Sequence, residues 1–400
     1  MNAAFPPASP TPARTDRVDS SGPALPAFAA ALALIALAAA PVTGQEVRLD
    51  LDDPAWSFDR EAEVRDVDGA PALVLRSGVA LREDIDFRDG TIEFEMRPTD
   101  RRAFLGVVFR TQENGDGEDV YLRLHKTGLA DATQYTPDYG GRGQWQIYHG
   151  PDATAPARFA AREWQRVRIE VRGSQAALFV GDAEEPQLVA DRLRAGVERG
   201  FIAFWGNHPG ATGDDPPTAA VRDIVIRHGE TSYAFEPPAV EKELPGIIGR
   251  WALSGTFARS GDDVLELPDP VPSGWRAVGV AENGVLELDR HAGRVQGGIS
   301  AVLAGVRIRS ADARTVRLRL GFSDDASVFL NGRLIATMRN AFSTNFPRRQ
   351  GLLLQEQAAV YLPLDAGDNT LVIAVGEIFG GWGLYGRIAD REGLEITPLE

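Results

Sequence analysis

The sequence predicts an all-β protein built from two β-sandwich (jelly-roll) domains that follow an N-terminal signal peptide. Short runs of alternating apolar and polar residues recur along most of the chain. The turn-forming residues are frequent, with 42 Gly and 26 Pro among 400 residues. No long segment shows the apolar period of 3.6 residues that helices require. The length suits two or three compact domains.

Composition and charge exclude several classes of function. The formal net charge of −15 disfavours nucleic acid or an anionic membrane as the main partner, because both require a basic protein surface. The absence of cysteine excludes disulfides, thiolate metal sites and a cysteine nucleophile. We therefore expect no nucleic-acid partner and no membrane contact beyond the signal segment. The sequence leaves the oligomeric state open.

Residues 1–44 have the layout of a secretory signal peptide. The almost wholly apolar run "PALPAFAAALALIALAAAPV" spans Pro23 to Val42, and Val42 and Gly44 stand at the −3 and −1 positions of a cleavage site. An uncleaved membrane anchor is the alternative, since the run approaches the ~20 residues that span a bilayer. Cleavage is favoured because Ala dominates the run and Pro stands at both ends. The mature protein is then expected to be secreted or periplasmic.

Residues 45–235 are predicted to form the first β-sandwich. In "TIEFEMR", "VYLRLHK" and "WQRVRIEVR", every second residue is apolar and belongs on the core side of a strand. We also expect a strand over "QWQIYH", from Gln144 to His149, with Trp145 and Ile147 facing the core.

A Pro-rich linker over residues 236–248 is expected to separate this domain from a second one over residues 249–400. The linker contains "EPPAVEKELPG", which holds three prolines and little apolar periodicity. The second half is again rich in strand patterns. Asn331 and Gly332 lie between two alternating arms and predict a hairpin, because both residues tolerate the positive φ of a type I′ turn.

Two resemblances follow from these motifs. From about Asp50 to Arg227, "DFRDGTIEFEMRP", "FLGVVFR", "EDVYLRLH" and "REWQRVRIEVRGSQAALFVGD" resemble the concanavalin A-like lectin/glucanase superfamily, in particular its laminin-G-like and 3-keto-disaccharide hydrolase-type branches. From about Trp251 to Ile396, "FSDDASVFLNGRLIAT" and "VYLPLDAGDNTLVIAVGEIFGGWGLYGRI" resemble a galactose-binding-like jelly roll. Together they imply an exported protein whose partner is a carbohydrate.

Strand alternation places a set of polar and aromatic side chains on one face of the first domain, and Gln134 and Tyr135 are expected in the loop between these strands. In this superfamily the concave sheet carries the ligand, and planar amides, guanidinium groups and aromatic rings suit the hydroxyls and C–H faces of sugars. A solvated convex face is the alternative interpretation. The candidate ligand-binding residues are Arg110, Tyr121, Arg123, His125, Gln134, Tyr135, Gln144, Gln146 and Tyr148.

Four acidic residues are candidates for catalysis. Glu93 and Glu95 lie at i and i+2, roughly 6.5–7 Å apart on one face of a strand, which a pair of glycosidase carboxyls permits. However, the laminarinase-type branch uses an E-x-D-x-E run, and "EFEMR" has neither the Asp nor the third acid. A solvated outer face is the favoured interpretation of this pair. Asp131 and Asp138 flank the "QYTPDY" loop and could serve as acids instead.

The acidic loop "ENGDGED" raises the question of a cofactor. Asp116, Glu118 and Asp119 are candidate ligands for Ca²⁺, which takes six to eight oxygens from flexible loops. The N-G and D-G pairs are also ordinary turn formers, so a polar hairpin is the simpler interpretation. We expect no cofactor, with Ca²⁺ as the exception to be tested.

The sequence thus predicts an exported carbohydrate-binding protein, with the glycan on the concave sheet of the first domain and an accessory jelly roll behind it. A glycoside hydrolase of the 3-keto-disaccharide hydrolase type is the first alternative. A structural or protein-interaction module is the second. No complete catalytic signature appears in the chain.

Overall fold

The structure is a computed structural model that describes residues 44–209, 219–239, 245–259, 267–272, 274–296, 298–343 and 348–400. The predicted signal peptide, apart from Gly44, and residues 240–244 of the predicted linker lie outside the described residues. The all-β prediction is confirmed. Within the described ranges the helices are two short turns, η1 (Leu124–Lys126) and α1 (Leu288–His291). None of the described helices has the length and apolar character needed to span a membrane.

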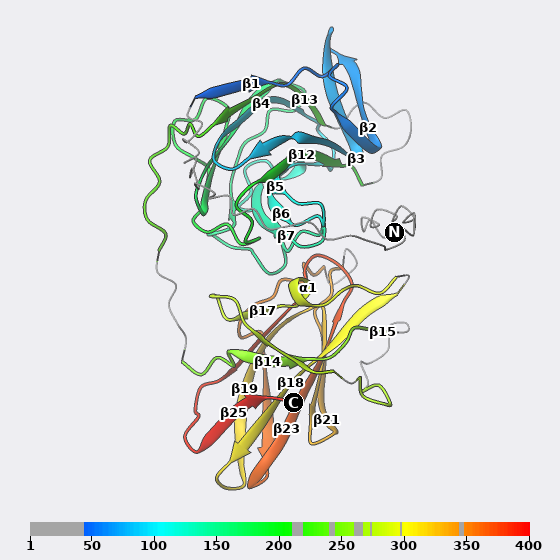
Figure 1. Cartoon of the computed structure of the whole chain (residues 1–400), viewed down its shortest axis with the longest axis vertical. Coiled ribbons are helices and arrows are strands. Elements are labelled where there is room, and N and C mark those ends of the chain that lie inside the picture. Colours follow the sequence, from blue (N-terminus) through cyan, green and yellow to red (C-terminus); the bar gives the residue numbers. More distant parts are fainter. Residues whose placement is uncertain are drawn as a thin grey trace, which may run out of the picture.

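The first domain is the upper body in Figure 1. Its strands are β1 (Gln45–Arg48), β2 (Ser57–Val67), β3 (Ala70–Phe87), β4 (Gly90–Pro98), β5 (Phe104–Thr111), β6 (Gly117–Arg123), β7 (Thr133–Asp138), β8 (Thr154–Ala155), β9 (Gln165–Arg172), β10 (Gln175–Val180), β11 (Leu188–Ala190), β12 (Gly200–Asn207) and β13 (Ala219–His228).

These strands pair in the order β11-β10-β9-β4-β13-β3-β12-β5-β6-β7-β8, with β1 on β13 and β2 on β3. The long strand β3 joins the two layers, because it pairs with β13 near Leu73 and with β12 from Ser77 onward. The alternating residues predicted to face inward on β4, β6 and β9 do so, whereas Trp145 and Ile147, also predicted to face the core, lie at the junction with the second domain. Phe94 of β4, Leu122 of β6 and Ile169 of β9 all belong to the buried core between the layers.

The second domain also consists of two packed sheets. Its strands are β14 (Arg250–Leu253), β15 (Phe257–Arg259), β16 (Arg276–Gly279), β17 (Val285–Glu287), β18 (Ile299–Ser310), β19 (Arg314–Ser323), β20 (Asp325–Leu330), β21 (Arg333–Arg339), β22 (Ala358–Leu364), β23 (Gly367–Glu377), β24 (Gly383–Ile388) and β25 (Leu394–Pro398).

One sheet has the order β16-β14-β18-β23-β20-β21, with β15 and β25 added on β18, and the other has the order β17-β24-β19-β22. Val306 of β18 and Ile373 of β23 pack against Leu320 of β19 in one core. The predicted hairpin is present between β20 and β21, where Asn331 has φ 50° and Gly332 has φ 77°. These positive values are those that a type I′ turn requires.

The prediction of a strand over Gln144–His149 is wrong. This segment forms a tight turn in which the amides of Ile147 and Tyr148 both donate to the carbonyl of Gln144, each at 2.9 Å. The amide of Gln146 donates instead to the carbonyl of Gly380 in the second domain, at 3.0 Å. Because its donors are used in these two ways, the segment has no row of free donors for a neighbouring strand.

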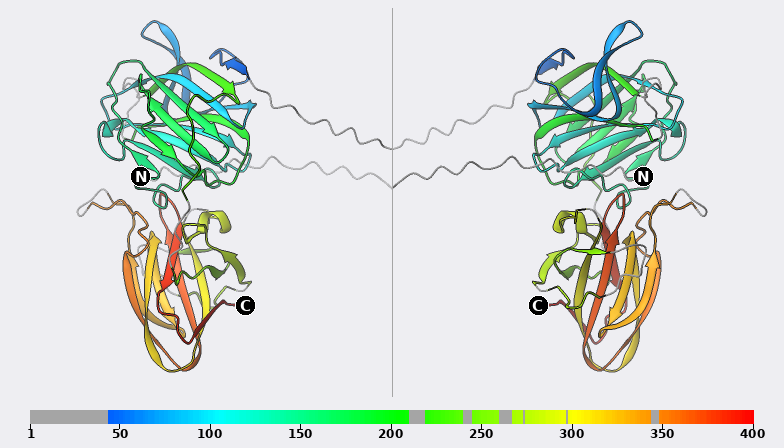
Figure 2. Two further views of the ribbon diagram at one scale, coloured as in Figure 1. Left: turned by 90° about the vertical axis from the view of Figure 1, so that its left-hand side faces the viewer. Right: turned by 90° about the vertical axis from the view of Figure 1, so that its right-hand side faces the viewer.

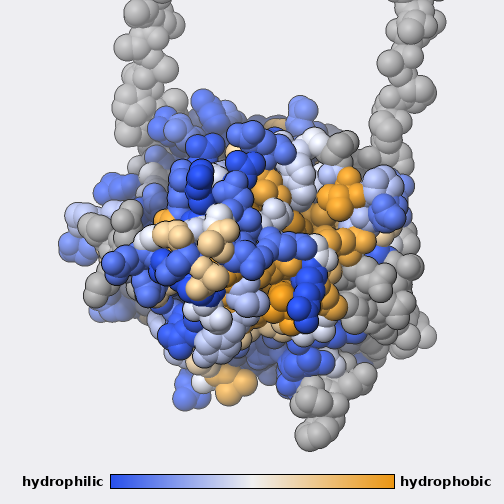
Figure 3. Space-filling view, turned by 90° about the horizontal axis from the view of Figure 1, so that it is seen from below, coloured by the Kyte–Doolittle hydropathy of each residue, from blue (hydrophilic) through white to orange (hydrophobic). Residues whose placement is uncertain are grey.

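The two domains lie end to end, with this segment at their junction (Figure 2). Seen along the long axis from the second domain, apolar residues gather in one area beside a mostly hydrophilic surface (Figure 3). Val271 and Leu334 are exposed apolar residues of this domain. Near the junction, a small apolar cluster joins Ile147 and Tyr148 of the first domain to Leu353 and Tyr385 of the second.

Candidate ligand-binding face

The outward side of β12, β5, β6 and β7 brings aromatic, carboxyl and guanidinium groups together. Register fixes this arrangement, since Trp205 lies opposite Gly106, Gly106 opposite Tyr121, and Tyr121 opposite Gln134. We call this surface the acid–aromatic face. It consists of Phe104, Asp119, Tyr121, Arg123, Gln134, Asp138 and Trp205.

Trp205 is the centre of the aromatic part of this face. Its ring lies 5.5 Å from that of Tyr121, and its Nε1 donates to the Asp119 carboxylate at 3.0 Å. Gly106 makes room for the indole, because a Cβ at this position would overlap the Trp205 ring. Phe104 continues the aromatic row, with its ring 5.1 Å from that of His125. Phe104, Trp205 and His125 remain partly exposed, whereas Tyr121 and Asp119 are buried.

Arg123 connects the polar side chains of the face. Its Nη2 donates to the Tyr121 hydroxyl at 2.8 Å and to Gln134 Oε1 at 2.6 Å. Gln134 in turn donates to the carbonyl of Tyr148 at 2.5 Å. The sequence prediction that Tyr121 and Arg123 share one face is therefore consistent with the geometry, and His125 lies at its edge. Gln134, expected in a loop, lies instead on β7, directly opposite Tyr121.

Two carboxyl groups lie side by side on this face. Asp119 pairs with Thr136, which places it diagonally across from Asp138 on the same side of β6 and β7. Burial raises the pKa of Asp138 to about 8, and the negative charges of Glu118 and Asp116 act in the same direction. Burial and the charge of Asp138 also raise the pKa of Asp119 well above its usual range. Asp138 Oδ1 is a buried oxygen without a hydrogen-bond partner in the described structure.

Arg110 and Tyr135 lie away from the acid–aromatic face. The Arg110 guanidinium is buried, donating to Asp89 Oδ1 at 3.0 Å and to the carbonyl of Gly173 at 2.8 Å. Tyr135 points into the core, where its hydroxyl donates to Glu118 Oε2 at 2.7 Å. Both side chains therefore make hydrogen bonds inside the first domain and do not contribute to the acid–aromatic face in the described structure.

Gln144, Gln146 and Tyr148 lie at the domain junction. Gln144 Oε1 accepts the amide hydrogen of Trp382 at 3.3 Å, and Gln146 Oε1 accepts the hydroxyl of Ser323 at 2.8 Å. The Tyr148 hydroxyl donates to Glu287, which also accepts the Tyr139 hydroxyl at 2.7 Å. The amide oxygens of Gln144 and Gln146 and the hydroxyl of Tyr148, which a sugar could bind, are thus already hydrogen-bonded to the second domain.

Glu93, Glu95 and Asp131 are engaged in ion pairs elsewhere in the first domain. Glu95 pairs with Arg222 at 2.7 Å and Glu93 with Arg227 at 3.5 Å, both on the outer side of β4 and β13. Asp131 pairs with Lys126. Among the candidate acids, Asp138 is the one that the structure places on the acid–aromatic face.

The calcium candidates point in three directions. Asp116 accepts the amide hydrogen of Gly140 at 2.8 Å, Glu118 faces the core, and Asp119 belongs to the acid–aromatic face. Within the described ranges, no group of three or more His, Cys, Asp or Glu side chains is arranged to hold a metal ion. Calcium binding at these residues stays a prediction.

Sequence reasoning missed the contact between Asp119 and Trp205 on this face. Asp119 stands two residues before Tyr121 and four before Arg123, so the same alternation that selected those two residues includes it. Trp205 had no comparable signal, because its contact with Asp119 joins β12 to β6 across β5.

Residues 50–227 match the family model of the 3-keto-alpha-glucoside-1,2-lyase-like domain. This confirms the predicted resemblance of the first domain to the 3-keto-disaccharide hydrolase type. The galactose-binding-like identity of the second domain stays a prediction. No curated protein matches the chain.

Three solved structures illustrate what the chain is similar to. A carbohydrate-binding module from Bacillus subtilis is 12% identical, with 43% of this chain and 95% of that chain covered and a TM-score of 0.32. The β-glucanase of Bacillus licheniformis is 13% identical, with 47% and 99% covered and a TM-score of 0.34. The laminarinase catalytic domain of Thermotoga maritima is 12% identical, with 48% and 100% covered and a TM-score of 0.34.

The raised pKa of Asp138 predicts a pH-dependent stability. An acid with a raised pKa stabilises the fold below its unfolded pKa, near 3.8, and this contribution is lost as the pH rises through about 8. We expect the Tm of the full chain to fall across this window, and to fall less in Asp138→Asn. Thermal unfolding at a series of pH values measures this. Asp182→Asn, which changes an exposed carboxylate, is the control. Identical pH profiles for Asp138→Asn and the unmodified chain would contradict the prediction.

The buried Glu287 carboxylate predicts a large loss of stability on truncation. Glu287→Ala leaves the Tyr148 hydroxyl buried without its acceptor, which costs about 1–3 kcal/mol, whereas the Tyr139 hydroxyl can still donate to the carbonyl of Arg194 at 3.1 Å. Glu282→Ala removes an exposed carboxylate that pairs with Arg192 and is expected to cost less than about 1 kcal/mol. Chemical denaturation of both variants measures the difference, and equal losses would rule out the proposed importance of Glu287.

Proposed function

We propose that the first domain binds a carbohydrate on the acid–aromatic face. The observation that carries this proposal is the Trp205 ring, which lies against Tyr121 and is hydrogen-bonded to Asp119. Aromatic rings offer an apolar surface to the C–H side of a sugar, and carboxylates accept hydrogen bonds from its hydroxyls. The match of residues 50–227 to a family named for a keto-glucoside supports a carbohydrate as the partner.

The proposed ligand first meets the partly exposed rings. Phe104 and Trp205 are the partly exposed rings of the face, with His125 partly exposed at its edge, whereas Asp119 and Asp138 are buried. Arg123 is held in place by Tyr121 and Gln134, so its position is set before a ligand arrives. Export of the chain through residues 1–44 belongs to the same proposal.

A second candidate function is cleavage of a 3-keto-glucoside by elimination. It is favoured by the two neighbouring carboxyls, whose raised pKa values keep one of them protonated near neutral pH. The ionised carboxylate would take the proton from carbon 2, next to the keto group. The C1–O bond would break as a C1–C2 double bond forms, and the carboxylic acid would protonate the departing oxygen. One proton is taken and one is given, so the pair ends with the same total charge.

Trp205→Ala tests the binding proposal. A glycan array with the full chain, read with and without calcium, first identifies a sugar. Calorimetric titration with that sugar is then expected to show a loss of affinity of about tenfold in Trp205→Ala, equivalent to about 1.4 kcal/mol. Trp164→Ala, which removes a ring stacked on Arg222 in another part of the domain, is expected to bind normally. Absence of array binding, or equal affinities in all three proteins, would overturn the proposal.

Asp138→Asn tests the cleavage candidate. Incubation of the full chain with a 3-keto-α-glucoside is expected to release the leaving sugar, with kcat lowered about 100-fold in Asp138→Asn. Asp131→Asn, which alters a carboxyl outside the face, is expected to keep the activity. If the unmodified chain binds the substrate without turning it over, cleavage is refuted and binding stands.

A further inference from the structure

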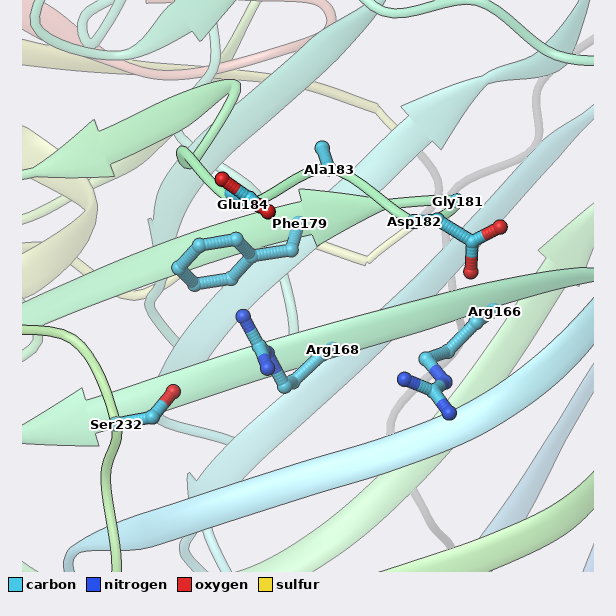
Figure 4. A pocket seen from close by; sticks show the side chains of 8 residues that line it. All are labelled: Arg166, Arg168, Phe179, Gly181, Asp182, Ala183, Glu184 and Ser232. Carbon is cyan, nitrogen blue, oxygen red and sulfur yellow. The ribbon is translucent and has the colours of Figure 1, made fainter.

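A cavity lies on the opposite side of the first domain from the acid–aromatic face. It has a volume of about 360 Å³ and is formed by β9, β10, the segment 181–184 and Ser232 (Figure 4). Val167 and Ile169 of β9 face the core, so Arg166 and Arg168 between and beside them point outward into this cavity. A volume of this size is at the lower end of the range for small-molecule sites.

The floor of the cavity is a planar stack. The guanidinium carbon of Arg168 lies 4.0 Å from the centre of the Phe179 ring, and Arg168 Nε lies 3.2 Å from the buried carboxylate of Glu170. Glu170 is held in turn by the amide and hydroxyl of Ser232, at 2.7 and 2.6 Å. These contacts fix the guanidinium plane before any ligand enters.

The rim supplies groups that remain available to a ligand. Arg166 is 55% exposed, and its closest carboxylate, on Glu93, is 4.0 Å away. Asp182 and Glu184 are exposed, and none of the hydrogen bonds or ion pairs of the described residues uses their carboxylates. In Figure 4, Arg166 and Asp182 lie at one end of the cavity and Ser232 at the other.

Charge balance narrows the class of ligand. Two guanidinium groups and two carboxylates line the cavity, so a strongly anionic or cationic ligand would meet as much repulsion as attraction. A neutral molecule with many hydroxyls can accept hydrogen bonds from Arg166 and Arg168 and donate to Asp182 and Glu184. We propose that this cavity is a second carbohydrate site, which takes one or two residues of a neutral sugar independently of the acid–aromatic face.

The test uses a pair of matched double variants. Arg166→Ala/Glu184→Gln removes two exposed groups that line the cavity, so the fold is expected to be retained. Arg172→Ala/Glu185→Gln removes the same residue types from exposed positions outside the cavity, one on the same strand and one directly after the segment 181–184. Asp119→Asn alters the acid–aromatic face alone. The probes are maltose as the neutral sugar and glucuronate as the anionic one.

Saturation-transfer NMR and titration of the full chain are expected to show that maltose binds. The affinity should fall at least about fivefold in Arg166→Ala/Glu184→Gln and stay unchanged in Arg172→Ala/Glu185→Gln, while Asp119→Asn reports separately whether maltose also occupies the acid–aromatic face. Glucuronate should bind more weakly than maltose. No maltose binding, an equal loss in the matched control, a loss only in Asp119→Asn, or tighter binding of glucuronate would each overturn the proposal. A loss confined to Asp119→Asn would still support the acid–aromatic face, so the two proposals fail separately.

Discussion

The hydrogen bonds that segment 139–149 makes with the second domain determine how the molecule is assembled. Tyr139 and Tyr148 both donate to Glu287, and Gln146 is enclosed by the second domain so closely that a Cβ at Gly351 would overlap it. The same segment contacts the acid–aromatic face, since Gln134 donates to the carbonyl of Tyr148 and Tyr139 follows Asp138 directly. Because each of these buried polar groups needs its partner, the junction and the face are structurally dependent on one another.

This dependence gives the second domain a part in the proposed binding site. The path from Glu287 runs through Tyr148 and Gln134 to Arg123, and each step is a hydrogen bond between residues that are not adjacent in sequence. An accessory domain that was only connected to the first domain by a linker would not need a buried carboxylate such as Glu287 at the domain junction. Each domain has a core of its own. The buried contact between them nevertheless makes the two domains depend on one another, unlike independent modules joined by a linker.

Much of the fold could be predicted from the sequence because strand alternation has a short, local period. Ile92, Val120 and Val167 were placed correctly, as was the Asn331-Gly332 hairpin, since neighbouring residues alone determine those patterns. The turn at Gln144–His149 could not be predicted, because its amide partners include Gly380, far along the chain. For the same reason, the alternation that placed Tyr121 and Arg123 on one face could not reveal that Gln144 and Gln146 would be hydrogen-bonded to another domain, or that Trp205 would reach Asp119.

The path of the chain between the domains has a mechanical consequence. After β13, the segment 229–239 stays attached to the first domain through Ser232 and Tyr233 on Glu170 and through the carbonyl of Glu236 on Gln175. The domains are thus joined twice, once by this anchored segment and once by the junction around Glu287. A force that pulls the domains apart would be shared between the two connections and would load several hydrogen bonds at the same time.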